Sequence, residues 1–105
     1  MFYTKILLQV FILAQTASTT IRGPETIDVY GVCNDLRLSE NSLTLLCSQF
    51  SNMKVIIFKN VGNSFQLHQI LFLNLHLWSI DINKNGSKIF IGFRYEHRID
   101  IYQQG

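Results

Sequence analysis

Charged residues are scarce in this chain of 105 residues, and the scarcity excludes several classes of protein. Asp, Glu, Lys and Arg make up 15% of the sequence, whereas about 25% is usual for a soluble domain. Proline occurs once and hydrophobic residues account for 48%, a balance that excludes intrinsic disorder as the default state. The 9 basic and 7 acidic residues give 9 − 7 = +2 and are scattered along the chain, so we expect no nucleic-acid surface.

Cysteines and long apolar runs are equally scarce. Two cysteines are too few for a small protein held together mainly by disulfides. No stretch of the sequence reaches the roughly 18 apolar residues that a membrane-spanning helix needs. We therefore expect no transmembrane anchor.

Motifs of known catalytic and metal sites are also missing. The sequence contains no G-x-S-x-G motif, no glycine-rich phosphate loop and no closely spaced acid pair, so it offers no nucleophile and no acid–base couple. The histidines lack the H-x-x-x-H spacing of zinc ligands, and we expect them at the surface. We predict no enzyme activity, no cofactor and no metal site. The histidines are His68, His76 and His97.

The N-terminal residues have the layout of a secretory signal peptide. Lys5 supplies a positive charge, residues 6–14 form an apolar run interrupted only by Gln9, and small or polar residues follow. Such a run is long enough to engage a translocation pore and too short to remain as an anchor. We predict a signal peptide over residues 1–17, cleaved near residues 16–18, and hence a secreted or secretory-pathway protein. A buried N-terminal strand or helix is the alternative.

After residue 25, apolar residues recur at alternate positions and are interrupted by clusters of Asn, Ser and Gly. This pattern is typical of strands and turns rather than of helices. The four leucines of residues 71–77 share one face, and Asn85-Gly86 supplies the positive φ angles that a tight hairpin requires. Short strands with such regular turns predict an all-β, antiparallel protein. The expected strands lie within residues 36–38, 43–47, 54–58, 80–82, 89–91 and 99–102.

An internal repeat is the most informative feature of the sequence. A shift of 44 residues places residues 36–60 on residues 80–104 without a gap, and core and turn positions then coincide. A period of roughly 40–45 residues that carries four strands is typical of one β-propeller blade. Two unrelated antiparallel sheets with similar strand spacing are the alternative. The coinciding pairs include Leu36 with Ile80, Leu38 with Ile82, Cys47 with Ile91, Ile57 with Ile101 and Phe58 with Tyr102.

Residues 79–92 and 98–102 carry a resemblance to a known family. They resemble a blade of the WD-repeat or YVTN-like β-propellers, in which a Gly-bearing turn separates two strands and a later strand ends in an aromatic residue. Tyr102 takes the place of the family's Trp in this copy, and Phe58 does so in the earlier one. The chain contains neither a Trp-Asp nor a Gly-His dipeptide, which favours the YVTN-like branch.

The resemblance implies antiparallel four-stranded propeller-type blades over residues 18–105. Residues 31–75 would form the first blade and residues 76–105 an incomplete second one; Ile27-Asp28-Val29-Tyr30 resembles residues 99–102 and hints at the tail of a preceding blade. Because propellers close with about four to eight blades, we expect an incomplete propeller. A truncated propeller is our interpretation, and assembly of several copies or a sandwich of two sheets are the alternatives.

The resemblance also implies a role in protein interaction or scaffolding, with a protein partner or a second copy bound. Two alternatives stay open. One is a fragment of an extracellular propeller enzyme, similar to a lactonase or hydrolase, and the other is a small self-associating secreted effector. A fold by itself does not fix a function.

One turn contains two further patterns. Asp81-Ile82-Asn83-Lys84-Asn85-Gly86 matches the first half of a calcium-binding loop. The later ligands, including the bidentate carboxylate, are missing, so we interpret the segment as a hairpin turn. Asn85-Gly86-Ser87 is an N-x-[ST] sequon, which makes Asn85 a candidate glycosylation site in a secreted chain.

Cys33 and Cys47 flank the predicted turn at residues 39–42, nearly opposite each other on its two strands. They form a disulfide if their Cα atoms lie within about 7 Å. The alternative is a pair of buried thiols packed as small hydrophobes. Their counterparts in the repeat, Leu77 and Ile91, are apolar, which favours that alternative.

Overall fold

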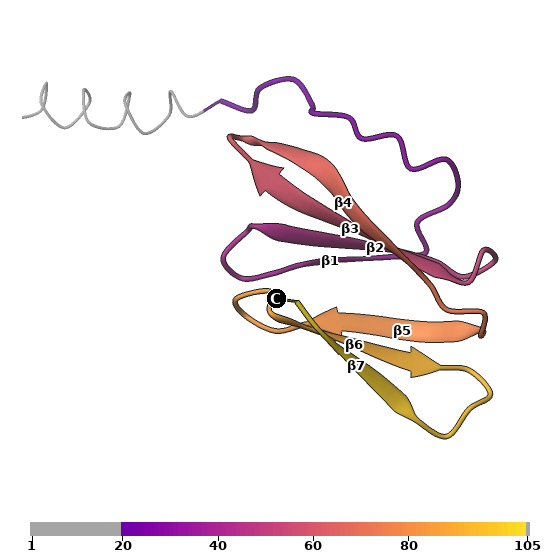
Figure 1. Ribbon diagram of the computed structural model, residues 1–105. Helices are drawn as coiled ribbons and strands as arrows, with labels where there is room; N and C mark the ends of the chain where they lie inside the picture. Colours follow the sequence, from indigo (N-terminus) through magenta and orange to yellow (C-terminus); the bar gives the residue numbers. More distant parts are fainter. Residues whose placement is uncertain (1–19, 105) are drawn as a thin grey trace, which may run out of the picture.

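The computed structural model describes residues 20–104, and the predicted signal peptide at residues 1–17 lies outside this range. The described residues form an all-β fold without a helix, in which a four-stranded sheet lies against a three-stranded one (Figure 1). Neighbouring strands in both sheets are antiparallel. The strands are β1 (Asp35–Leu38), β2 (Thr44–Gln49), β3 (Lys54–Val61), β4 (Ser64–Phe72), β5 (Leu77–Ile82), β6 (Lys88–Phe93) and β7 (Ile99–Gln103).

Membrane insertion through a helix finds no support in this part of the chain. Within residues 20–104, no helix is long and apolar enough to cross a bilayer.

The pattern of buried residues along a strand depends on whether one or both faces of its sheet are covered. In β3, Val55 to Phe58 are all buried, because the four-stranded sheet is covered on both faces. In β6, buried Ile89, Ile91 and Phe93 alternate with more exposed residues, which is the pattern of a strand with one covered face. The continuous run of buried residues in β3 therefore belongs to the sheet that is covered on both faces, and the alternating pattern in β6 belongs to the sheet that is covered on one face.

The main core lies between the two sheets. One face of the β1–β4 sheet contributes three buried side chains to it, one face of the β5–β7 sheet contributes five, and partly buried side chains from both sheets pack around them. The leucines of residues 71–77 all contact this core, although residues 73–76 connect β4 to β5 rather than belong to a strand. The buried members are Leu46, Val55 and Ile57 from the first sheet, and Leu77, Ile80, Ile89, Ile91 and Phe93 from the second.

A second core lies on the opposite face of the β1–β4 sheet. It contains Cys47, Ile56 and Phe58, and residues 20–34 run across it (Figure 1). Residues 27–30 form no strand there, so the expected resemblance of this segment to β7 does not extend to its structure. The physical reason is that its polar groups bond to side chains instead of to a neighbouring strand.

Two hydrogen bonds that each involve one side chain hold the N-terminal segment in place. Gln49 Nε2 donates to the Val29 carbonyl over 3.0 Å, and the Phe65 N–H donates to the Glu25 carboxylate over 2.8 Å. Ile27 and Val29 pack against the second core, and the segment thus covers this face without forming a strand.

Strand register is the same in the two sheets when residues 44 apart are compared. Leu36 is the Cα partner of Cys47, and Ile80 is that of Ile91. The pairing of β6 with β7 likewise follows that of β2 with β3. The bounds of β2 and β6 also differ by 44 residues at both ends.

The β1–β2 and β5–β6 turns have matching hydrogen bonds. The Ser42 N–H donates to the Ser39 carbonyl over 2.8 Å, and the Gly86 N–H donates to the Asn83 carbonyl over 3.0 Å. Ser42 and Gly86 have positive φ angles of 64° and 77°. The predicted hairpin turn is present between β5 and β6, but the expected positive φ at Asn85 is wrong, because of the two residues only Gly86 adopts it.

Side chains explain why the β5–β6 turn is wider than a two-residue hairpin. Asn83 Oδ1 accepts the Lys88 N–H over 2.9 Å, and Asn85 Oδ1 accepts the Ser87 N–H over 3.0 Å. These bonds replace main-chain partners within the turn. The two turns also touch each other, since Asn41 Nδ2 donates to the Asn85 carbonyl over 3.1 Å.

Candidate functional site

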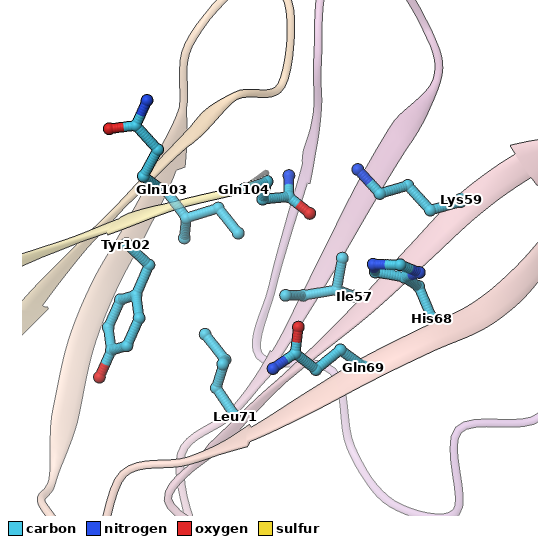
Figure 2. Close-up of a pocket in the computed structure, with 9 residues that line it drawn as sticks. Ile57, Lys59, His68, Gln69, Leu71, Tyr102, Gln103 and Gln104 are labelled. Atoms are coloured by element: carbon cyan, nitrogen blue, oxygen red, sulfur yellow. The ribbon is translucent and has the colours of Figure 1, made fainter.

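A cleft of about 220 Å³ opens between the two sheets beside β7 (Figure 2). Both sheets contribute to its walls, and most of its polar lining consists of nitrogen-bearing side chains. No Asp or Glu lines it among the described residues. The lining residues are Ile57 and Lys59 from β3, His68, Gln69 and Leu71 from β4, Ile89 from β6, Tyr102 and Gln103 from β7, and Gln104.

Lys59 is the cationic side chain of this cleft. It lies two residues after Ile57 in β3 and so points to the same face of the sheet, where it lines the cleft. Its Nζ donates to Thr44 Oγ1 over 3.0 Å, and burial lowers the pKa of this group below the ordinary value of 10.5. An ammonium group with a hydroxyl partner and no carboxylate nearby is a binding site for an anionic oxygen.

Gln104 faces Lys59 from the other sheet. Figure 2 shows its amide extending into the cleft from the end of β7. Its Nε2 donates to the Gly86 carbonyl, which leaves its Oε1 buried without a hydrogen-bond partner among residues 20–104. A buried acceptor without a donor costs free energy, so this atom favours a ligand that carries an N–H or O–H group.

One edge of the three-stranded sheet borders the cleft. β7 pairs with β6 and has no strand on its other side within the described residues, whereas its counterpart β3 lies between β2 and β4. An edge strand exposes N–H and C=O groups that a further strand can pair with.

The far side of the three-stranded sheet carries three apolar side chains beside the polar Ser79 and Asp81. We call Phe90, Ile99 and Ile101 the outer face, because their side chains point away from the β1–β4 sheet. Ile99 and Ile101 are 68% and 61% exposed, and Phe90 is half-buried. A cluster of exposed apolar side chains of this kind marks an interaction surface.

The two cysteines form a disulfide. Cys33 lies just before β1 and bonds to Cys47 in β2, with 5.4 Å between their Cα atoms. Cys47 is fully buried. The expectation that the two residues lie nearly opposite is wrong, because Leu36 is the Cα partner of Cys47. The bond instead ties the N-terminal segment to the sheet.

The calcium-like segment serves the β5–β6 turn. The Asp81 carboxylate accepts the Ile82 N–H over 2.8 Å, and the amide oxygens of Asn83 and Asn85 accept N–H groups of the turn. These contacts use the oxygens that a cation would need. Asn85 is exposed, and its glycosylation stays a prediction.

The histidines are exposed, and the structure does not bring them together as metal ligands. His76 packs edge-on against Tyr95, with ring centroids 5.7 Å apart. Arg94 lies over Trp78 and Tyr95, at 5.2 and 5.3 Å from the ring centroids. Within residues 20–104, no group of three or more His, Cys, Asp or Glu side chains is arranged to hold a metal ion.

No pattern in the sequence indicated the cleft. Its polar residues Lys59, Gln69 and Gln104 come from β3, β4 and the end of β7, and no short motif links them. The one local signal was Lys59 itself, a charge directly after the apolar run of β3. Comparisons with models of known protein families, with curated proteins and with solved structures found no match for this chain.

Proposed function

We propose that this chain is a protein-interaction or scaffold module built from propeller-type blades, and that a protein partner covers its outer face. The observation that carries the proposal is the position of Phe90, Ile99 and Ile101. Their counterparts 44 residues earlier point toward the next sheet and are buried against it. These counterparts are Leu46, Val55 and Ile57.

The direction of stacking supports blades rather than a sandwich. In a sandwich related by a two-fold axis, residues 44 apart would both enter the core between the sheets. Here Leu46 enters that core while its counterpart Phe90 points outward, and Ile91 enters it while its counterpart Cys47 points to the other side. The two sheets therefore face the same way, which is how repeated units stack.

The same stacking leaves an apolar face at one end. In repeat proteins each unit buries its faces against its neighbours. The β1–β4 sheet is covered on both faces, by residues 20–34 and by the β5–β7 sheet. The outer face has no such cover within the described residues, so a protein surface is the ligand that its chemistry favours.

Site-specific crosslinking tests this role. A photoreactive phenylalanine analogue replaces Ile101, and a matched control places it at Asn63, an exposed turn residue away from the outer face. We expect crosslinks to a second polypeptide from position 101 and none from position 63. The experiment uses the medium of the cells that make the protein. A chain that is monomeric there and forms no crosslink from position 101 would contradict the proposal.

We further propose that the chain passes through the secretory pathway. The Cys33–Cys47 disulfide supports this, since disulfides persist in oxidising compartments. The intact mass of the secreted protein tests it. We expect loss of about 17 residues by signal cleavage, no reaction of the cysteines with a thiol reagent, and a glycan that the Asn85→Gln variant lacks. A chain that stays inside the cell with its N-terminal Met and with reactive thiols would contradict it.

A further inference from the structure

β7 repeats the position of β3 but lacks a strand on its outer edge. Leu45 pairs with Phe58 where β2 meets β3, and Ile89 pairs with Tyr102 where β6 meets β7. Beyond β3 lies β4, while beyond β7 the described residues place no strand. Extended peptides bind to edges of this kind by adding a strand, and their main-chain hydrogen bonds supply much of the affinity.

The β3–β4 pairing shows which side chains of an added strand would enter the cleft. In β4, Leu67 is the Cα partner of Phe58 and Ile70 is that of Ile56. The corresponding β7 residues are Tyr102 and Asp100, and Tyr102 packs toward the core between the sheets. Because paired residues point to the same face of a sheet, strand residues opposite Tyr102 and Asp100 would point toward β3 and β4. That space is the cleft in Figure 2.

The groups already in the cleft determine the chemistry of the incoming side chain. Lys59 has one hydroxyl partner and faces no carboxylate among the lining residues. The Gln104 Oε1 atom is a buried acceptor without a donor. A carboxylate would accept from Lys59, and an N–H group of the added strand or its side chains would donate to Gln104.

We propose that the β7 edge binds an extended peptide segment of a partner protein as an antiparallel fourth strand, with an acidic residue opposite Tyr102 reaching Lys59. This proposal rests on the interaction role proposed above and names the chemistry of one partner. The added strand would extend the β5–β7 sheet by one strand. The outer face and the β7 edge would then belong to one continuous interface.

A partner protein fits the edge better than a second copy of the chain does. Among the other edge strands of a second copy, β4 contains no acidic residue. The carboxylates of Asp35 in β1 and Asp81 in β5 already contact Arg37 and the Ile82 N–H. Antiparallel pairing of two β7 edges would also bring the β1–β4 sheets of both copies into the same space. Each of these sheets is one strand wider than the β5–β7 sheet, and β4 already overhangs the β7 edge at the cleft.

Synthetic peptides test the proposal. The probe has the sequence of β4 with Glu at the place of Leu67 (Ser-Phe-Gln-Glu-His-Gln-Ile-Leu-Phe), and its matched control has Gln at that place. We expect the Glu peptide to bind about tenfold more tightly than the Gln peptide, the effect of one charge-assisted bond. In the Lys59→Met protein, the two peptides should bind equally. Isothermal titration calorimetry measures the affinities.

Two further measurements separate strand addition from other binding. The amides of β7 should exchange with solvent more slowly in the presence of the Glu peptide, and N-methylation of the peptide backbone should abolish binding. Equal affinities of the Glu and Gln peptides for the natural protein, or protection of other strands instead of β7, would overturn the proposal. If the chain self-associates through β7 and the peptide displaces the second copy, the natural occupant of the edge is a second copy and the proposal is wrong.

The two proposals fail in distinguishable ways. If the peptides do not bind but position 101 still crosslinks to a protein, strand addition is wrong and the interaction role stands. If the peptides do not bind and position 101 yields no crosslink, both proposals are wrong.

Discussion

Two glycines with similar backbone conformations have different surroundings. Gly86 and Gly62 have φ angles of 77° and 57°, a region that favours glycine. A Cβ atom on Gly86 would lie 2.8 Å from Thr44 Oγ1, whereas a Cβ on Gly62 would meet no atom within 4 Å. The turn of one sheet therefore approaches the other sheet at Gly86 as closely as a glycine allows.

Substitution by alanine should separate these two effects. We expect Gly62→Ala to lower the free energy of unfolding by about 1 kcal/mol, the cost of a left-handed alanine. Gly86→Ala should lower it by about 2–3 kcal/mol, because the methyl group also displaces Thr44. Urea denaturation of both variants measures the difference. Equal losses would show that the two sheets do not approach each other at this turn.

The titration of Lys59 should affect stability at alkaline pH. Burial lowers its pKa below 10.5 in the folded chain, so the unfolded chain binds more protons between the two values. The free energy of unfolding should therefore rise with pH across that interval and level off above about 10.5. Because other groups titrate there too, the quantity to measure is the difference between the natural protein and Lys59→Met. A difference that is independent of pH would contradict the effect.

At the scale of elements, the disulfide stabilises the N-terminal segment as a cover for the β1–β4 sheet. Cys33 and Cys47 are 14 residues apart in sequence, and both contact the second core with Ile27 and Val29. The bond restricts the unfolded chain and holds the segment against β2 and β3.

Reduction of this disulfide should lower the free energy of unfolding by about 3 kcal/mol, the value typical of a loop of this length. Chemical denaturation with and without a phosphine reductant measures the change. The Cys33→Ala/Cys47→Ala double variant is the control, and it should not respond to the reductant. An unchanged denaturation midpoint after complete reduction would contradict the role of the bond.

At the scale of the whole molecule, residues 44 apart differ in what covers them. Ile57 is 2% exposed in the core between the sheets, and its counterpart Ile101 is 61% exposed on the outer face. The same residue type in the same strand position thus has a neighbouring sheet in one case and none, within residues 20–104, in the other.

Truncation of these two isoleucines should give unequal losses of stability. We expect Ile57→Ala to lower the free energy of unfolding by about 2–5 kcal/mol and Ile101→Ala by at most about 0.5 kcal/mol. Thermal denaturation at low protein concentration measures both. A large, concentration-dependent loss for Ile101→Ala would show that a second copy covers the outer face. A large loss that is independent of concentration would contradict the exposed position.

Local sequence patterns predicted the strands because alternation is a property of the strand itself. The expected strand at residues 54–58 lies within β3, and that at 99–102 lies within β7. The strand β4 was less apparent because it contains the polar residues Gln66, His68 and Gln69. Its side chains line the edge of the stack, where no continuous apolar face is required.

The sequence by itself determined an all-β chain with turns at Asn, Ser and Gly, because these signals depend on neighbouring residues alone. Only the tertiary structure decided that the two sheets face the same way, that Cys33 bonds to Cys47, and that Lys59 and Gln104 meet across a cleft. Each of these features joins residues from different strands. Such contacts follow from how sheets stack and from what covers each face, and no periodicity along the chain encodes that information.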